Sequence, residues 1–212
     1  DEPGRRHKRQ THRDQIALND IIFDYIQFAR PEFQAVHDFL KSRVITETKG
    51  VFSGIPVDEL TDSKLDQYCV MPAPKKSKKA ANETPRLKNI NTVVDGLEVI
   101  YGTGGLHASQ PPSIWRASET HQIIDVDVTS LYPSIAIVNR LYPEHLTEKF
   151  ADVYAELKRE RLKHAKGSTT NAMLKLALNG VYGFSNSIYT PFYDPAFTMS
   201  ITVNGQLLLS ML

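Results

Sequence analysis

The clearest hydrophobic pattern in the chain is the stretch 123–128, where apolar residues surround two acids in the sequence IIDVDV. Short apolar runs of this kind predict a strand that is buried on at least one face. Side chains alternate along a strand, so Asp125 and Asp127 would lie on the same side. A desolvated carboxylate is costly unless a cation offsets its charge, and the pattern therefore indicates a metal site at the end of this strand.

Helical periodicity predicts several helices, which span residues 16–40 (interrupted at Pro31), 130–139, 147–166, 169–179 and 194–212. Gly167 is expected to end the third of these helices. Asp194 is expected to cap the last one, because it precedes Pro195 in the first turn. Residues 169–179 would then fold back antiparallel to residues 147–166.

The remaining segments predict short strands and loops. Residues 44–52 and 97–101 have strand patterns, and the second leads into the glycine-bearing sequence GTGGLH. Residues 72–86 are rich in proline and lysine and are interpreted as a solvated linker, while residues 1–16 are polar and expected to be poorly ordered. The expected fold class is α/β (α+β), with a mostly helical, partly loose N-terminal region.

Composition narrows the function classes only slightly. Lys and Arg total 25 against 24 acids, a balance that argues neither for nor against nucleic acid, although the basic residues occur in runs such as KKSKK. The single cysteine, Cys69, excludes an internal disulfide and fits a reducing cytoplasm. The sequence contains neither an apolar stretch of membrane-spanning length nor an apolar segment at its start that would suit a signal peptide.

Two segments in the right order, DVTSLYPSI and KLALNGVYG, resemble motif A and motif B of the B-family DNA polymerases, and FYDPAFTMSITVNGQLLL resembles the phage-type members. The matching positions are Asp127, Ser130, Leu131, Tyr132, Pro133, Ser134 and Ile135 in the first motif, and Lys175, Asn179, Tyr182 and Gly183 in the second. Gly180 departs from the motif, because serine is more common there in the family.

The resemblance implies specific roles for motif A. The Asp127 carboxylate and the Val128 carbonyl would hold Mg²⁺, with two ions in the complete enzyme and Mn²⁺ as an alternative. The backbone N–H groups of Ser130 and Leu131 begin a helix, and free amides at a helix N-terminus suit a triphosphate. Tyr132 would lie beneath the incoming sugar and exclude a ribose 2′-hydroxyl. Asp125 lies outside the motif and is interpreted as a structural acid.

The resemblance also implies roles for motif B and for the helix before it. Lys175 would act on the triphosphate as a catalytic residue, and Asn179, which lies on the same helix face, would bind the nucleotide. Tyr182 and Gly183 would pack against the nascent base pair. On the preceding helix Arg159 and Lys163 are candidates for phosphate contact, with Arg161 as a rival, and solvent exposure is an even alternative for each.

The segment from Tyr101 to Gly105 lacks the third glycine of a dinucleotide-binding loop. It resembles instead the tyrosine–glycine–glycine segment that precedes motif A in protein-primed and phage-like polymerases. On that likeness Tyr101, Gly104 and Gly105 would contact the template strand, and the glycines would allow close approach of the backbone to a phosphate.

The resemblance implies a DNA-templated DNA polymerase that binds primer–template DNA and dNTPs, and other replication proteins are further candidate partners. The expected architecture is part of a palm with an antiparallel sheet, followed by two antiparallel fingers helices. The expected segments are 1–96 before the palm, 97–146 with motif A, 147–186 as fingers and 187–212 as a palm helix.

The sequence contains no counterpart of motif C, the Y-x-D-T-D hairpin that supplies a second metal-binding acid. We therefore expect the chain to be a piece of a longer polymerase that does not incorporate nucleotides in isolation. Two alternatives remain open. One is a non-catalytic nucleic-acid-binding module of the same fold. The other is a metal nuclease using Asp125 and Asp127, which the basic segment after motif A disfavours.

Overall fold

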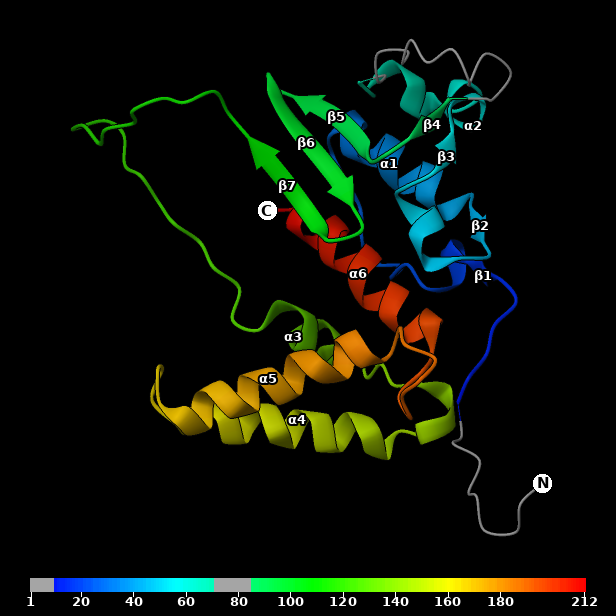
Figure 1. Ribbon diagram of the computed structural model, residues 1–212. Helices are drawn as coiled ribbons and strands as arrows, with labels where there is room; N and C mark the ends of the chain where they lie inside the picture. The colour runs from blue at the N-terminus through cyan, green and yellow to red at the C-terminus, as the bar shows by residue number, and fades with distance from the viewer. Residues whose placement is uncertain (1–9, 71–84) are drawn as a thin grey trace, which may run out of the picture. The chain divides into compact units, whose positions relative to one another are not determined.

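The structure is a computed structural model that describes residues 10–70 and 85–212. It contains helices and small antiparallel sheets, which confirms the α+β class (Figure 1). The chain divides into two compact units: Asp1–Phe23 with Ser130–Gly205 form unit 1, and Asp24–Thr129 with Gln206–Leu212 form unit 2. Each unit is thus assembled from two stretches that lie far apart in the sequence. The four consecutive segments expected from the sequence remain a prediction.

Unit 1 is mainly helical. Its elements are β1 (Ile16–Ala17), the 3₁₀ turns η1 (Leu18–Asp20) and η4 (Glu144–Leu146), and the helices α3 (Leu131–Val138), α4 (Lys149–Leu162), α5 (Thr169–Phe184) and most of α6 (Pro195–Leu209). Helices α4 and α5 lie side by side and antiparallel (Figure 1), as predicted, and the Tyr154 hydroxyl donates to the Leu178 carbonyl across them at 2.6 Å. The core beneath them is formed by the buried residues Ala136, Tyr154, Leu178, Phe197 and Ile201.

The ends of α4 and α5 differ from the prediction. Helix α4 ends at Leu162 rather than near Lys166, because the buried Asn171 amide donates to the carbonyls of Arg161 and His164 at 3.1 and 3.0 Å and so satisfies the last turn. Helix α5 continues to Phe184 rather than ending at Asn179. Its two glycines are tolerated inside the helix because its inner face packs on the core.

Unit 2 contains a three-stranded antiparallel sheet formed by β5 (Ile90–Val94), β6 (Leu97–Gly102) and β7 (Gly105–Ser109). Asp95 and Gly96 join β5 to β6, and both have positive φ angles, 51° and 80°, as a tight two-residue hairpin requires. The remaining elements are α1 (Pro31–Lys41), β2 (Val44–Ile45), η2 (Thr48–Val51), β3 (Ile55–Pro56), which pairs with β4 (Arg86–Leu87), α2 (Val57–Thr61) and η3 (Lys64–Gln67).

The N-terminal region is not mostly helical. Residues 16–30 contain β1, η1 and irregular chain, so the first half of the predicted 16–40 helix is wrong. Helix α1 begins at Pro31, because proline fits the first turn of a helix. The predicted strand at 44–52 is reduced to β2. The predicted linker at 72–86 lies almost entirely outside the described residues.

The predicted strand at 123–128 is also wrong. Residues 121–128 have no regular secondary structure, and the side chains of Ile123, Ile124 and Val126 are 64%, 68% and 71% exposed. A strand is stable only when neighbours satisfy its backbone and cover its apolar face, and no strand among the described residues pairs with this segment (Figure 1). Within the described part of the chain, no helix is both long and apolar enough to cross a membrane.

Candidate functional site

The turn that leads into α3 has an uncommon backbone conformation. Ser130 caps this helix with φ 54° and ψ 55°, the left-handed region that residues other than glycine rarely adopt. The Ser130 carbonyl accepts hydrogen bonds from both the backbone N–H and the hydroxyl of Ser134, each at 2.8 Å. The Ser130 side chain does not cap α3 and is free to accept a bond from elsewhere.

Two cations of α4 donate to the serines of this turn. The Arg161 guanidinium donates through Nη1 to the Ser130 hydroxyl, and Lys158 Nζ donates to the Ser134 hydroxyl at 2.6 Å. Burial and the neighbouring charge of Arg161 lower the pKa of Lys158. The beginning of α3 and the middle of α4 are therefore joined by charge-assisted hydrogen bonds.

The sequence analysis named Arg159 and Lys163 as candidates for phosphate contact, and their surroundings differ from those of Lys158 and Arg161. Arg159 is exposed, and Lys163 forms an ion pair with Glu160 at 2.7 Å. Of the basic residues on this helix it is Arg161, the rival in the sequence analysis, and Lys158, which had no assigned role, that contact motif A. Their spacing of three residues was the available signal, because it places both on one helix face.

Aromatic residues of the two motifs lie in contact. The rings of Tyr132 in α3 and Tyr182 in α5 have centroids 4.7 Å apart, and the Tyr182 hydroxyl bonds the Thr202 hydroxyl in α6 at 2.7 Å. Gly205 makes room for this packing, because a Cβ there would lie 3.2 Å from Tyr132 Cε1. Burial, and then the neighbouring Tyr182, raises the pKa of Tyr132. Unit 1 thus brings the turn of motif A and the end of motif B together.

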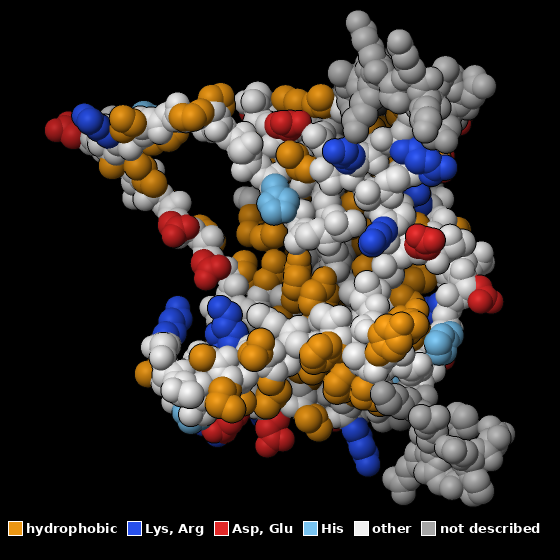
Figure 2. Space-filling view, in the orientation of Figure 1, with side chains coloured by type: hydrophobic (Ala, Val, Ile, Leu, Met, Phe, Trp, Pro, Cys, Tyr) orange, Lys and Arg blue, Asp and Glu red, His pale blue; other side chains and the backbone are white. Residues whose placement is uncertain are grey.

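The outer face of α5 carries the other residues of motif B. Lys175, Asn179 and Gly183 are exposed. Exposed hydrophobic side chains also lie over the α4–α5 pair (Figure 2), and they include Val153, Met173, Leu176 and Phe184. This surface combines an amine, an amide and apolar groups. At the departure from the motif, a Cβ on Gly180 would lie 3.3 Å from the Phe184 ring, so a serine there would require this exposed ring to shift slightly.

Asp127 and Val128 belong to the extended segment of unit 2 rather than to the end of a buried strand. Both Asp125 and Asp127 are exposed, so burial does not require either carboxylate to have a cation beside it. Among the described residues no group of three or more histidine, cysteine or acidic side chains is placed to hold a metal ion. A carboxylate and a backbone carbonyl are nevertheless oxygen ligands of the kind that Mg²⁺ prefers.

Tyr101 has a structural role. Its side chain is fully buried and its hydroxyl bonds Ser210 at 2.7 Å, and burial raises the pKa of Tyr101 to about 12. The ring is therefore held inside unit 2, and its contact with a template strand stays a prediction. Next to it, the Gln206 amide donates to the Gly102 carbonyl at 3.0 Å and accepts from the Gly102 N–H at 3.1 Å. Gly104 remains exposed, while Gly105 is buried and pairs with Gly102 in the sheet.

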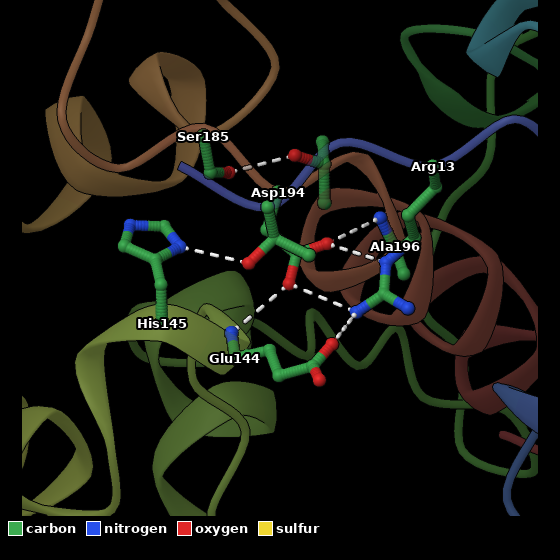
Figure 3. A network of polar contacts seen from close by, with 8 residues as sticks. Arg13, Glu144, His145, Ser185, Asp194 and Ala196 are labelled. Carbon is green, nitrogen blue, oxygen red and sulfur yellow. Dashed lines mark hydrogen bonds and ion pairs between the residues drawn. The ribbon is translucent and has the colours of Figure 1, made fainter. Parts of the chain in front are cut away.

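A network of polar contacts surrounds Asp194 at the beginning of α6 (Figure 3). Asp194 Oδ1 accepts from Arg13 Nε at 2.9 Å and from the Ala196 N–H at 3.1 Å, and Oδ2 accepts from the Glu144 N–H at 3.0 Å. Burial alone would raise the pKa of this carboxyl, but these hydrogen bonds and the charge of Arg13 outweigh it and lower the pKa. Asp194 caps the helix as predicted.

The residues around Arg13 are also held in place. Thr11 donates its backbone N–H to the Tyr193 carbonyl at 3.0 Å, and its hydroxyl lies 2.9 Å from His145 Nδ1. The Gln10 amide donates to the carbonyls of Ile188 and Thr190 at 2.7 and 2.6 Å. The expectation that residues 1–16 are poorly ordered is therefore wrong for residues 10–16, and residues 1–9 lie outside the described part.

Comparisons of the chain with models of protein families, with curated proteins and with solved structures found no match.

Proposed function

We propose that the chain is part of a DNA-templated DNA polymerase of the B-family type, in which unit 1 carries the nucleotide-binding surface. The observation that supports this most is the contact between Tyr132 and Tyr182, whose ring centroids are 4.7 Å apart. These tyrosines come from segments fifty residues apart that resemble motifs A and B, and both motifs serve one nucleotide site in that family. A chance resemblance would have no reason to pack these two positions together.

The chemistry at the beginning of α3 supports the same proposal. A helix N-terminus offers unpaired amides and a partial positive charge, and the ammonium of Lys158 and the guanidinium of Arg161 add to it. Such a surface suits a triphosphate. Tyr132 next to it has the bulk to exclude a 2′-hydroxyl, which would restrict the substrate to deoxynucleotides.

Asp127 and Val128 would hold Mg²⁺ through oxygen atoms, and the ion would supply charge neutralisation at the reacting phosphates. Lys175 would bind the triphosphate from α5, and Asn179 the nucleotide. Their exposure on one face of α5 leaves both side chains accessible to a ligand.

Nucleotide binding is the direct test. The chain would be mixed with a primer–template and a photoreactive dNTP in the presence of Mg²⁺, and cross-linking would be measured against dNTP concentration. We expect cross-linking to be stronger when the nucleotide complements the template base. Asp127→Asn should weaken it at least about tenfold, the loss of one charge-assisted contact, whereas Asp125→Asn in the same exposed segment should leave it unchanged.

Lys175→Ala should weaken binding by a similar factor, and Lys149→Ala, which removes an exposed charge at the beginning of α4, serves as its control. Equal effects of the Asp127 and Asp125 substitutions would contradict the proposed metal role. Cross-linking that ignores both template base and metal would refute the polymerase proposal and favour a non-catalytic nucleic-acid-binding module. This alternative stays under test because no group of three or more histidine, cysteine or acidic side chains among the described residues is placed to hold a metal ion.

A further inference from the structure

We propose that Arg161 is a positioning residue, which holds Ser130 in its left-handed conformation and so fixes the turn of motif A for nucleotide binding. The inference rests on the proposed function and extends it to a residue that the motifs do not contain. Arg161 would act through the Ser130 side chain rather than through the nucleotide.

The backbone of Ser130 gives the first reason. Its φ of 54° is unfavourable for a residue with a Cβ, by roughly a factor of ten in population. Such a conformation persists only where surrounding contacts impose it. This residue immediately precedes Leu131 and Tyr132, so its backbone angles decide where the first amides of α3 and the Tyr132 ring are directed.

The contacts of Ser130 give the second reason. Its carbonyl is held by Ser134, which in turn accepts a hydrogen bond from Lys158, and its hydroxyl is held by Arg161. Hydrogen bonds from α4 therefore hold the Ser130 hydroxyl directly and the Ser130 carbonyl through Ser134. Since Lys158 reaches the turn through Ser134 and Arg161 reaches it directly, Arg161 has the larger control over Ser130.

A direct phosphate contact is the competing role for Arg161. Its Nε is buried and has no hydrogen-bond partner among the described residues, so this donor would be available to an anion. The two roles differ in one respect: a positioning role depends on the identity of residue 130, whereas a phosphate contact does not.

The test uses this difference, with the same cross-linking titration and circular dichroism as a check of folding. Arg161→Gln should weaken dNTP binding about tenfold in the wild-type background. Ser130→Ala keeps the backbone amide and the Arg161 charge but removes the accepting hydroxyl, and it should cause a similar loss. Ser130→Gly also keeps the backbone amide, and it is the reference background because glycine adopts positive φ without a penalty.

The deciding measurement is Arg161→Gln combined with Ser130→Gly. We expect the arginine substitution to cost less than about twofold in this background, because glycine no longer needs to be held. Equal losses in both backgrounds, or normal binding by Ser130→Ala, would overturn the inference and leave the proposed function intact. A wild-type chain that binds DNA but shows no template-dependent nucleotide binding would instead refute the proposed function.

Discussion

Asp194 is the residue whose environment departs most from that of a surface acid. It is 1% exposed, and it combines an ion pair with Arg13 and hydrogen bonds from two backbone amides. Each contact favours the charged carboxylate over the neutral acid, and together they outweigh the cost of burial. One side chain therefore caps α6 and ties residues of the N-terminal segment and of η4 to it.

The lowered pKa of Asp194 predicts a specific loss of stability in acid. A carboxyl whose pKa is lower when folded stabilises the protein above its unfolded pKa, near 4, and this contribution disappears as the pH falls towards the folded pKa. Asp194→Asn should reduce the free energy of unfolding by about 2 kcal/mol at pH 7, because it leaves Arg13 without its main partner. Urea unfolding at pH 7 and pH 3 would measure this.

The difference between wild type and Asp194→Asn should shrink at pH 3, because below the unfolded pKa the unfolded chain binds a proton at this carboxyl more readily than the folded protein does. Asp14→Asn, an exposed neighbour of Arg13, is the control and should change neither curve. A difference that stays constant with pH would show that the ion pair does not stabilise the fold.

At this scale the sequence predicted the cap but not the network. A helix cap depends on neighbours in sequence, and Asp194 followed by Pro195 is sufficient to predict it. Arg13 lies 181 residues away from Asp194, in a stretch whose polar composition indicated poor order. Long-range ion pairs leave no trace in local composition. For the same reason the sequence could list Arg159, Arg161 and Lys163 but could not decide which of them contacts motif A.

The pair formed by α4 and α5 depends on a side chain that is not part of either motif. The Asn171 amide lies in the first turn of α5 and closes the end of α4 through two carbonyls. Asn171 itself is 7% exposed, so its amide is committed to these contacts. The position of the helix that carries Arg161 thus depends on Asn171.

Asn171→Ala should therefore reduce the free energy of unfolding by about 1 to 3 kcal/mol, because two hydrogen bonds to the end of α4 are lost. Thermal unfolding followed by circular dichroism would detect it. Thr170→Ala, an exposed substitution in the same turn, is the control. If both variants unfold at the same temperature as wild type, the contact contributes nothing to the stability of the helix pair.

Helices and strands were predicted correctly where residues close in sequence determine them. They were predicted wrongly where a distant part of the chain must pair with them. The antiparallel arrangement of α4 and α5 follows from helix periodicity and from Gly167, which was expected to end the first of these helices. The stretch 123–128 has a strand pattern but no strand partner among the described residues. Hydrogen bonding between strands is a tertiary property, and an apolar pattern cannot supply it.

Each of the two units combines a stretch from early in the sequence with a stretch from late in the sequence, so the chain is interleaved between the units. In unit 1 the early stretch is held by the Arg13–Asp194 ion pair. In unit 2 the late stretch is held by the contacts of Gln206 with Gly102 and of Ser210 with Tyr101. The exposed segment 110–128 lies between the parts of the chain that supply these contacts.

A protease site inserted between Arg116 and Ala117, where the side chains are exposed, should therefore be cleaved without separating the two fragments. Size-exclusion chromatography after cleavage should show one peak that contains both. Combining Arg13→Ala with Gln206→Ala should weaken the association, because one contact in each unit is lost. The same insertion without protease treatment is the control. Fragments that elute apart in the wild-type background would contradict this interleaving.

The amide of Gln206 offers one donor and one acceptor to the main chain of Gly102, as a neighbouring peptide group would. Hydrolysis of that amide to a carboxylate, a slow reaction that heat accelerates, would replace the donor with an oxygen facing another oxygen. Aged or heated preparations would then lose order at this contact without any change in the gene. The mass increase of about 1 Da that accompanies deamidation makes such molecules detectable before other measurements are interpreted.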